Sequence, residues 1–267
     1  MFILKRLLFL GVVFFAVSAM VMGQNTDRSV PSANTTAGTP EMSVEQSYLQ
    51  ESVELMIIRE QSRADSRDMK LVALDYIGDA IKRGNKGDDI RSALEYLSME
   101  GVVNKTRENG RLINNYPDIR TKAATYLGQL GTPEAKNALI KMVLADNEPM
   151  VITEAIKSLA TIGQNDNDDT VNAISWVVTR FDVLNPDNLL ALSALEAYEK
   201  LAAANGGIKD PNVIRTIIRI ADGNYIRPVQ DRAKQVLMDM RKYNGQNSQN
   251  QNNQGQSNQG QNNQTGK

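Results

Sequence analysis

Apolar positions recur along this chain with a helical spacing, and the clearest longer pattern returns after 32 residues. The stretch 119–131 reads IRTKAATYLGQLG, and the stretch 151–163 reads VITEAIKSLATIG. Both place an apolar or small residue at positions 1, 5, 9 and 12 and end in glycine, and fainter copies begin at Met69, Leu190 and Val229. One helix pair of this length cannot bury its own apolar face, so the period predicts a solenoid of stacked helix pairs.

Proline, glycine and capping residues divide each repeat into a first helix, a turn and a second helix. Proline precedes a first helix where a missing N–H costs nothing, and glycine ends it where the chain turns left-handed. These signals are Pro117, Pro149, Pro186 and Pro228, then Gly131 and Gly163, then the second-helix starts Thr132-Pro133 and Asp210-Pro211. Helical periodicity runs through residues 43–243 without a convincing strand pattern, which predicts an all-α solenoid of about five helix pairs.

A leading cap helix is expected ahead of the first pair. Ser43 and Gln46 have capping-box spacing, in which each side chain satisfies the other residue's backbone N–H. The helix is predicted to extend to about Ala64. Its expected apolar stripe consists of Tyr48, Val53, Leu55, Met56 and Ile57.

The repeat pattern I/V-R-x-x-A-A-x-x-L-G-x-L/I-G, followed by PEAKNAL at 133–139, resembles the armadillo-like HEAT repeat. The variety it resembles also occurs in bacterial phycobilisome-lyase-like proteins. The match is close at 119–144, good at 151–181 and degenerate at 69–99, 190–221 and 229–243. The resemblance implies a scaffold or adaptor that binds a protein, because enzymes are rare among HEAT-repeat proteins.

The two ends differ from the repeats. Lys5 and Arg6 precede an apolar block over residues 7–22, which is typical of a secretory signal peptide at 1–23. An uncleaved anchor is the alternative, although the 16 residues of this block fall short of the ~20 that span a bilayer. Export to the periplasm, the cell envelope or the medium is therefore expected, with membrane contact only through an uncleaved signal segment.

Residues 24–42 read as a disordered polar linker and residues 244–267 as a disordered Asn/Gln-rich tail. Fifteen of the 23 residues from 245 to 267 are Asn or Gln, so this segment has no apolar side chain to bury. The tail is either a spacer or a self-associating or surface-adhering segment.

Composition excludes several kinds of chemistry. The chain has no histidine, so triad catalysis and imidazole metal sites are absent, and it has no cysteine, so packing alone holds the fold. The net charge of −1 gives no basic stripe for a nucleic acid. We expect no enzymatic activity, no cofactor, no metal and no small-molecule substrate.

Three connecting segments are candidate sites. The acids of 166–170 suggest calcium, but the EF-hand template fails at Val171 and Val177, which favours a turn at a helix start. Residues 84–88 lack the spacing of a phosphate loop and are read as a connection. The insertion 100–116 carries the hairpin dipeptide Asn109-Gly110 and is either a protruding binding element or a connection folded over the repeat edge.

Aligning the second helices on Ala93, Ala138, Ala173 and Thr216 gives the sharpest hypothesis. Matching i, i+4 positions then hold Ser92/Tyr96, Asn137/Lys141, Asn172/Trp176 and Arg215/Arg219. In solenoids that this chain resembles, second helices line the concave face. An outward column of Tyr96, Lys141, Trp176 and Arg219 has the aromatic and cationic character of an interface hot spot. In the alternative, Trp176 and Tyr96 turn inward and fill the core.

The pattern therefore favours a non-enzymatic interaction scaffold in the cell envelope that binds a protein through its concave face. One alternative is an envelope spacer that contacts wall or matrix through its Asn/Gln tail. A HEAT-like lyase is a weaker alternative, because such enzymes act on tetrapyrroles.

The first prediction concerns export. Because a basic start, a short apolar block and small residues precede Gln24, we expect residues 1–23 to be missing from the exported protein. Intact-mass spectrometry of protein recovered from the exporting cells measures this. A mass that includes residues 1–23 would contradict cleavage and support the anchor.

Overall fold

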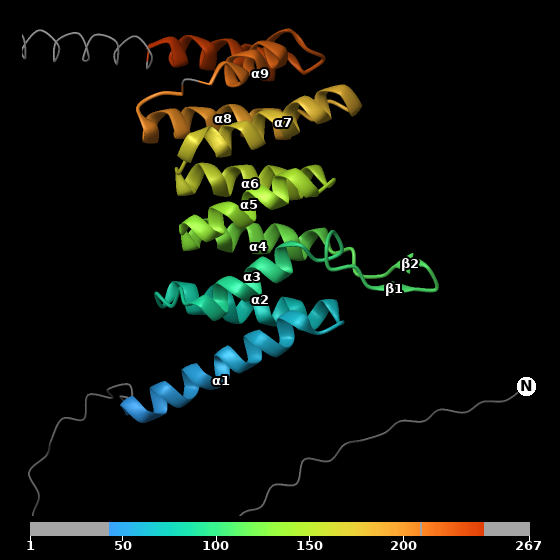
Figure 1. The fold of residues 1–267 in the computed structure, drawn as a ribbon, viewed down its shortest axis with the longest axis vertical. Helices are drawn as coiled ribbons and strands as arrows, with labels where there is room; N and C mark the ends of the chain where they lie inside the picture. The colour runs from blue at the N-terminus through green and yellow to red at the C-terminus, as the bar shows by residue number, and fades with distance from the viewer. Residues whose placement is uncertain (1–42, 209, 243–267) are drawn as a thin grey trace, which may run out of the picture. The chain divides into compact units, whose positions relative to one another are not determined.

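The protein is described here by a computed structural model that covers residues 43–208 and 210–242, all within one compact unit that begins at Ser43. These residues form a stack of α-helices with one small hairpin at its side (Figure 1). In chain order the elements are α1 (Val44–Arg63), α2 (Arg67–Lys82), α3 (Asp88–Ser98), β1 (Arg107–Glu108), β2 (Arg111–Leu112), α4 (Pro117–Leu130), α5 (Pro133–Ala145), α6 (Pro149–Ile162), the 3₁₀ turn η1 (Asp166–Asp168), α7 (Asp169–Leu184), α8 (Asn188–Asn205), α9 (Pro211–Asp222) and a last helix at 227–242.

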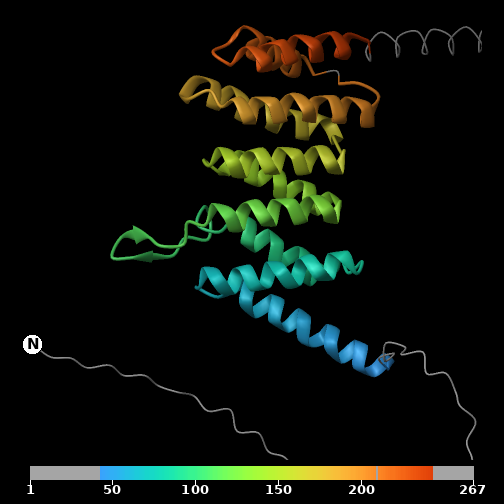
Figure 2. The same ribbon diagram turned by 180° about the vertical axis from the view of Figure 1, so that it is seen from behind.

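The helices form two layers, as an all-α solenoid requires. First helices α2, α4, α6 and α8 pack on one another in sequence, and second helices α3, α5, α7 and α9 do the same. Figure 2 shows the first-helix layer from its own side. The helix at 227–242 begins a fifth repeat on α8, to which Arg232 is linked by an ion pair with Glu199. The described residues end with this helix, so after α1 they contain four complete helix pairs and this one further helix.

The helix ends follow the predicted signals. Gly131 and Gly163 end α4 and α6 in the left-handed conformation, with φ of 71° and 75°. The Thr132 side chain accepts a hydrogen bond from the Ala135 N–H at 3.2 Å and starts α5. Ser43 and Gln46 form the predicted capping box of α1, so the repeat boundaries were readable from local chemistry alone.

Small residues let the first helices approach one another closely. A Cβ placed on Gly128 of α4 would lie 2.8 Å from the Ser158 Cβ of α6, so no larger residue fits without displacement. Ile119, Ala123 and Leu127 on the same helix have no exposed surface. The close approach of α4 and α6 joins successive repeats within the layer of first helices.

Two buried ion pairs lie in this hydrophobic stack. Arg120 Nε of α4 donates to Asp146 Oδ2 at 2.6 Å, and the two side chains are only 1% and 3% exposed. Lys70 of α2 occupies the equivalent position one repeat earlier and lies 3.2 Å from Glu100 Oε2. Arg120 also donates to the Glu100 carbonyl oxygen at 3.0 Å, which joins the two repeats.

The predicted stripe of the cap helix is wrong for most of its residues. Tyr48, Val53 and Met56 are 72%, 52% and 63% exposed, and only Ile58 and Ser62 of α1 are buried. Figure 1 shows the reason: the first part of α1 slants away from the stack, so it extends past the edge of α2 and α3. A helical period alone does not tell whether a neighbour is present to cover it.

The insertion 100–116 forms a hairpin that projects from the helices (Figure 1). Asn109 and Gly110 make its turn with φ of 50° and 81°, as the dipeptide predicted. Across the described residues, no helix is both long enough and apolar enough to cross a membrane.

The second prediction concerns the buried pair. Asp146→Ala leaves the Arg120 guanidinium buried without its carboxylate, and we expect a loss of roughly 3–5 kcal/mol in the free energy of unfolding. Urea unfolding followed by circular dichroism measures it. The matched control is Asp75→Ala, which removes the carboxylate of a surface ion pair with Lys122. The Asp75 side chain is 70% exposed, so this change should leave the urea midpoint nearly unchanged. Equal losses in both variants would contradict the assigned role.

Candidate protein-interaction face

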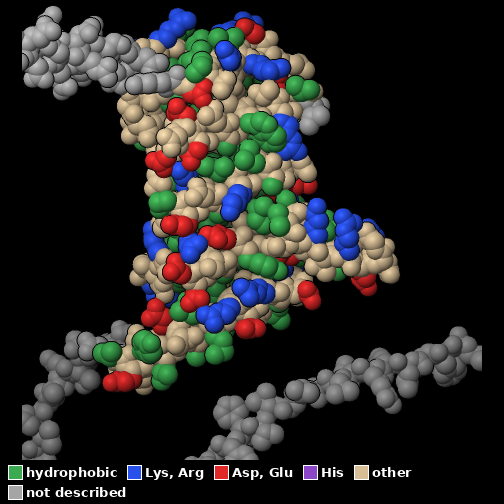
Figure 3. Space-filling view, in the orientation of Figure 1, with side chains coloured by type: hydrophobic (Ala, Val, Ile, Leu, Met, Phe, Trp, Pro, Cys, Tyr) green, Lys and Arg blue, Asp and Glu red, His purple; other side chains and the backbone are tan. Residues whose placement is uncertain are grey.

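The second helices carry the predicted column on their outer side. Tyr96 lies on α3, Lys141 on α5, Trp176 on α7 and Arg219 on α9. Trp176 is 49% exposed, Lys141 and Arg219 are exposed, and Tyr96 is half-buried. Trp176 is therefore not a core residue, while a role of the column in binding stays a prediction. In Figure 3, which shows this side of the stack, hydrophobic side chains lie beside Lys and Arg side chains.

One hollow on this face lies between α7 and α9, and we call it the Trp176 groove. Its volume is about 810 Å³. Its lining consists of Asn172, Ser175, Trp176, Thr179, Arg180 and Val183 of α7 with Asn212, Arg215, Thr216 and Arg219 of α9. The Arg180 guanidinium carbon lies 5.4 Å from the centre of a Trp176 ring, within the range of a cation–π contact.

The floor of the groove is held by a buried tyrosine from the other layer. Tyr198 of α8 has no exposed surface, and its hydroxyl lies 2.8 Å from Ser175 Oγ. Burial raises the pKa of Tyr198 above its usual range, with hydrogen bonds to Ser175 and Thr216 opposing the shift. The phenol therefore stays protonated at neutral pH and fixes α7 and α9 against α8.

Arg219 does not offer a free charge to this groove. Its Nε donates to Asp182 Oδ2 at 2.6 Å. Tyr225, in the segment after α9, lies beside the same Asp182 carboxylate. Burial is the main cause that raises the pKa of Tyr225, and the charge of Asp182 raises it further, so this phenol stays protonated. Arg219 thus lines the groove while its charge is balanced by Asp182.

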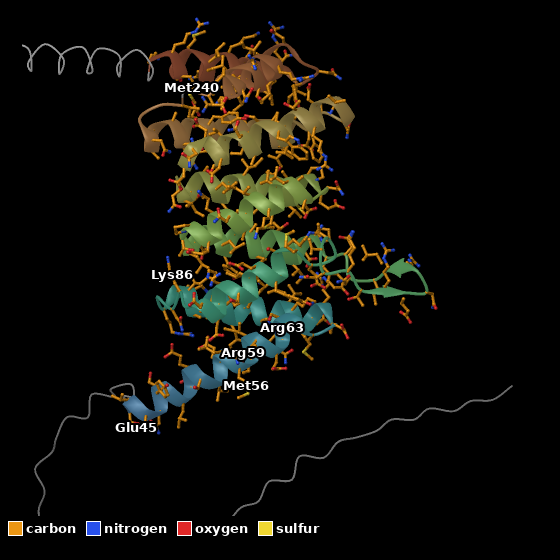
Figure 4. All side chains as sticks on the ribbon, in the orientation of Figure 1. Glu45, Met56, Arg59, Arg63, Lys86 and Met240 are labelled. Carbon is orange, nitrogen blue, oxygen red and sulfur yellow. The ribbon has the colours of Figure 1, made fainter. Side chains whose placement is uncertain are left out.

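Tyr96 and Lys141 line a second and smaller hollow, of about 350 Å³, between α3 and α5. The Tyr96 ring lies 5.4 Å from Lys70 Nζ and 6.0 Å from the guanidinium carbon of Arg63. Arg63 belongs to α1 and is labelled in Figure 4. Burial raises the pKa of the Tyr96 phenol. The structure thus brings the column together in two pairs, Tyr96 with Lys141 and Trp176 with Arg219.

The acidic segment 166–170 is a helix-start turn, and a lysine binds two of its three carboxylates. Lys136 Nζ of α5 donates to Asp166 Oδ2 at 2.8 Å and to Asp169 Oδ2 at 2.7 Å. The hydrogen bond from Lys136 is the main cause that lowers the pKa of Asp166. Within the described residues, no three or more His, Cys, Asp or Glu side chains are grouped so that they could hold a metal ion.

The segment 84–88 also has a structural role. Lys86 Nζ donates to the Gln129 carbonyl oxygen at 2.6 Å and so satisfies the carboxyl end of α4. Figure 4 labels Lys86 in the connection between α2 and α3. The lysine thus joins neighbouring repeats, as expected for a connection and not for a phosphate loop.

The hairpin of the insertion is anchored at its base by Asn114. Its amide donates to Glu100 Oε1 at 2.8 Å and to the Asn104 carbonyl oxygen at 2.6 Å, and its Oδ1 accepts from the Thr106 N–H. Of the two interpretations of this insertion, protrusion is what the structure shows (Figure 1). Lys105, Arg107 and Arg111 on it are exposed.

Sequence reasoning missed Arg180 and Asp182. Arg180 follows Trp176 by four residues, so helical spacing alone could have placed it on the same face. Asp182 belongs to α7 and compensates Arg219 of α9, 37 residues later, and no local pattern signals that pairing. The sequence therefore identified the four residues of the column, but not the carboxylate of Asp182 that balances the charge of Arg219.

Comparison with known proteins agrees with this architecture. Residues 111–179 match the family model for HEAT repeats, a range that contains α4, α5, α6 and most of α7. No curated protein matches the chain. The matched residues include the two closest copies of the repeat, and neighbouring helix pairs continue the same packing on either side. Together, the family match over residues 111–179 and the helix stack show that this chain contains HEAT repeats.

Proposed function

We propose that this protein is a non-enzymatic scaffold that binds a protein partner through the outer face of its second helices, the concave face of related solenoids. The observation that carries the proposal is the position of Trp176, the chain's single tryptophan. It stands 49% exposed in a groove of about 810 Å³ instead of lying in the core. Tryptophan is usually highly buried and is enriched among residues that dominate binding energy.

The surroundings of Trp176 support a binding role. Tyr198 and Ser175 fix the floor below it, and Arg180 stacks on its ring. A rigid aromatic side chain costs little conformational entropy when a partner covers it. HEAT repeats commonly mediate protein–protein interaction, which supports a protein partner in general.

The proposed location is the cell envelope, with export directed by residues 1–23. Those residues and the Asn/Gln-rich tail lie outside the described part of the chain, so this element rests on sequence pattern. Deleting residues 245–267 separates the scaffold from a tail-anchored spacer. A scaffold keeps its partner after the deletion, whereas a spacer held by its tail is released from the envelope.

The third prediction is that Trp176→Ala separates stability from binding. Because half of the side chain is exposed, we expect the melting temperature to fall much less than in Leu139→Ala, whose fully buried leucine should cost roughly 2–5 kcal/mol. Partner affinity should weaken by roughly 2 kcal/mol or more if Trp176 anchors the interface. Thermal unfolding and co-purification from the envelope fraction with immobilised protein measure the two effects.

The matched control is Leu189→Ala, which truncates an exposed apolar side chain on first helix α8, away from the groove. It should retain the partner at the wild-type level. A large fall in the melting temperature of Trp176→Ala would show that Trp176 acts as a structural residue. Unchanged capture by a well-folded Trp176→Ala protein would contradict binding through this face.

A further inference from the structure

The charged side chains that line the Trp176 groove carry an excess of positive charge. Among the described residues that line it, Arg180, Arg215 and Arg219 are the charged ones, and all three are positive. Arg219 is compensated by Asp182, which leaves two guanidinium groups to consider. The smaller hollow differs, because Arg63 and Lys141 line it together with Glu95 and Glu134.

Arg180 and Arg215 have neutral hydrogen-bond partners among the described residues. Arg180 donates to the Asp146 carbonyl oxygen at 3.2 Å and to the Asn147 side-chain oxygen, and these bonds hold it beside Trp176. Arg215 donates to Asn212 Oδ1 at 3.3 Å. Several other arginines on the helices have carboxylate partners, among them Arg59, Arg67 and Arg91.

An uncompensated guanidinium beside an exposed aromatic ring has a defined chemical preference. A guanidinium offers up to five N–H donors in a planar fork that matches a carboxylate. Trp176 and the exposed side chain of Val183 offer apolar surface in the same groove. A ligand that satisfies both features carries a carboxylate close to a bulky apolar group.

We propose that the Trp176 groove binds a polypeptide segment in which an Asp or Glu side chain lies next to a bulky apolar residue, and this inference rests on the proposed protein-binding function. The carboxylate lies between Arg180 and Arg215, and the apolar side chain packs on Trp176. A volume of about 810 Å³ accommodates several residues of a chain, more than a single side chain needs. A nucleic acid is disfavoured, because two free cations do not make the basic stripe that a phosphate backbone requires.

The test uses the intrinsic fluorescence of Trp176, which reports on the groove because the chain has no other tryptophan. The probes are two pooled sets of hexapeptides, blocked at both ends, random at four positions and free of tryptophan. One set has Glu-Leu at its centre and the other has Gln-Leu. A partly exposed ion pair to arginine stabilises a complex only modestly. We therefore expect the Glu-Leu set to reach half-saturation at a concentration about fivefold lower than the Gln-Leu set.

Arg215→Gln should remove this difference between the two sets, whereas the matched control Arg227→Gln, an exposed arginine outside the groove, should preserve it. Far-ultraviolet circular dichroism checks that both variants fold. Equal half-saturation by the two sets, no response to either, or a difference that survives Arg215→Gln would overturn the inference. Tighter binding of a ten-nucleotide oligothymidylate than of the Glu-Leu set would also overturn it and would point to a nucleic acid.

Failure of this inference and failure of the proposed function give different results. If the peptide sets are not distinguished but Trp176→Ala still loses the captured partner, the groove binds a protein without a preference for carboxylates. If the Glu-Leu preference is found but Trp176→Ala keeps the captured partner, the groove binds acidic segments and the main partner uses another face.

Discussion

The burial of one repeat by the next is the constraint on which the rest of this structure depends. A single helix pair cannot cover its own apolar face, so each pair is stable only in contact with its neighbours. Close approach of α4 and α6 at Gly128 and Ser158 makes this contact tight. Because the covered faces are those between the repeats, the outer side of the second helices is left free to carry residues such as Trp176.

Within this stack, the buried ion pairs add interactions of defined geometry to the apolar contacts between repeats. Apolar packing tolerates sliding, whereas Arg120 must reach both Asp146 and the Glu100 carbonyl oxygen. Lys136 links α5 to the turn before α7 in a similar way. These bonds fix how one repeat follows another, and so they determine which second-helix side chains share a groove.

The Trp176 groove combines that fixed geometry with a local excess of positive charge. Tyr198 holds its floor, Arg180 is positioned by the loop after α5, and Asp182 balances the charge of Arg219. The other hollow of the same face has balanced charges. Neighbouring positions of one column therefore offer different chemistry, which is how a repetitive scaffold can select one kind of partner segment over another.

The sequence by itself determined the repeated helix pairs and their boundaries, because caps, Pro, Gly and helical spacing are local properties. Whether Trp176 faces outward or fills the core stayed open until the structure placed it 49% exposed. The sequence placed Tyr96, Lys141, Trp176 and Arg219 in one column and predicted the Asn109-Gly110 hairpin. Only the tertiary structure decided that the column divides into two hollows, that Asp182 compensates Arg219, and that most of the α1 stripe is exposed. Each of these depends on which neighbour lies across a contact, and that information is spread over residues far apart in the chain.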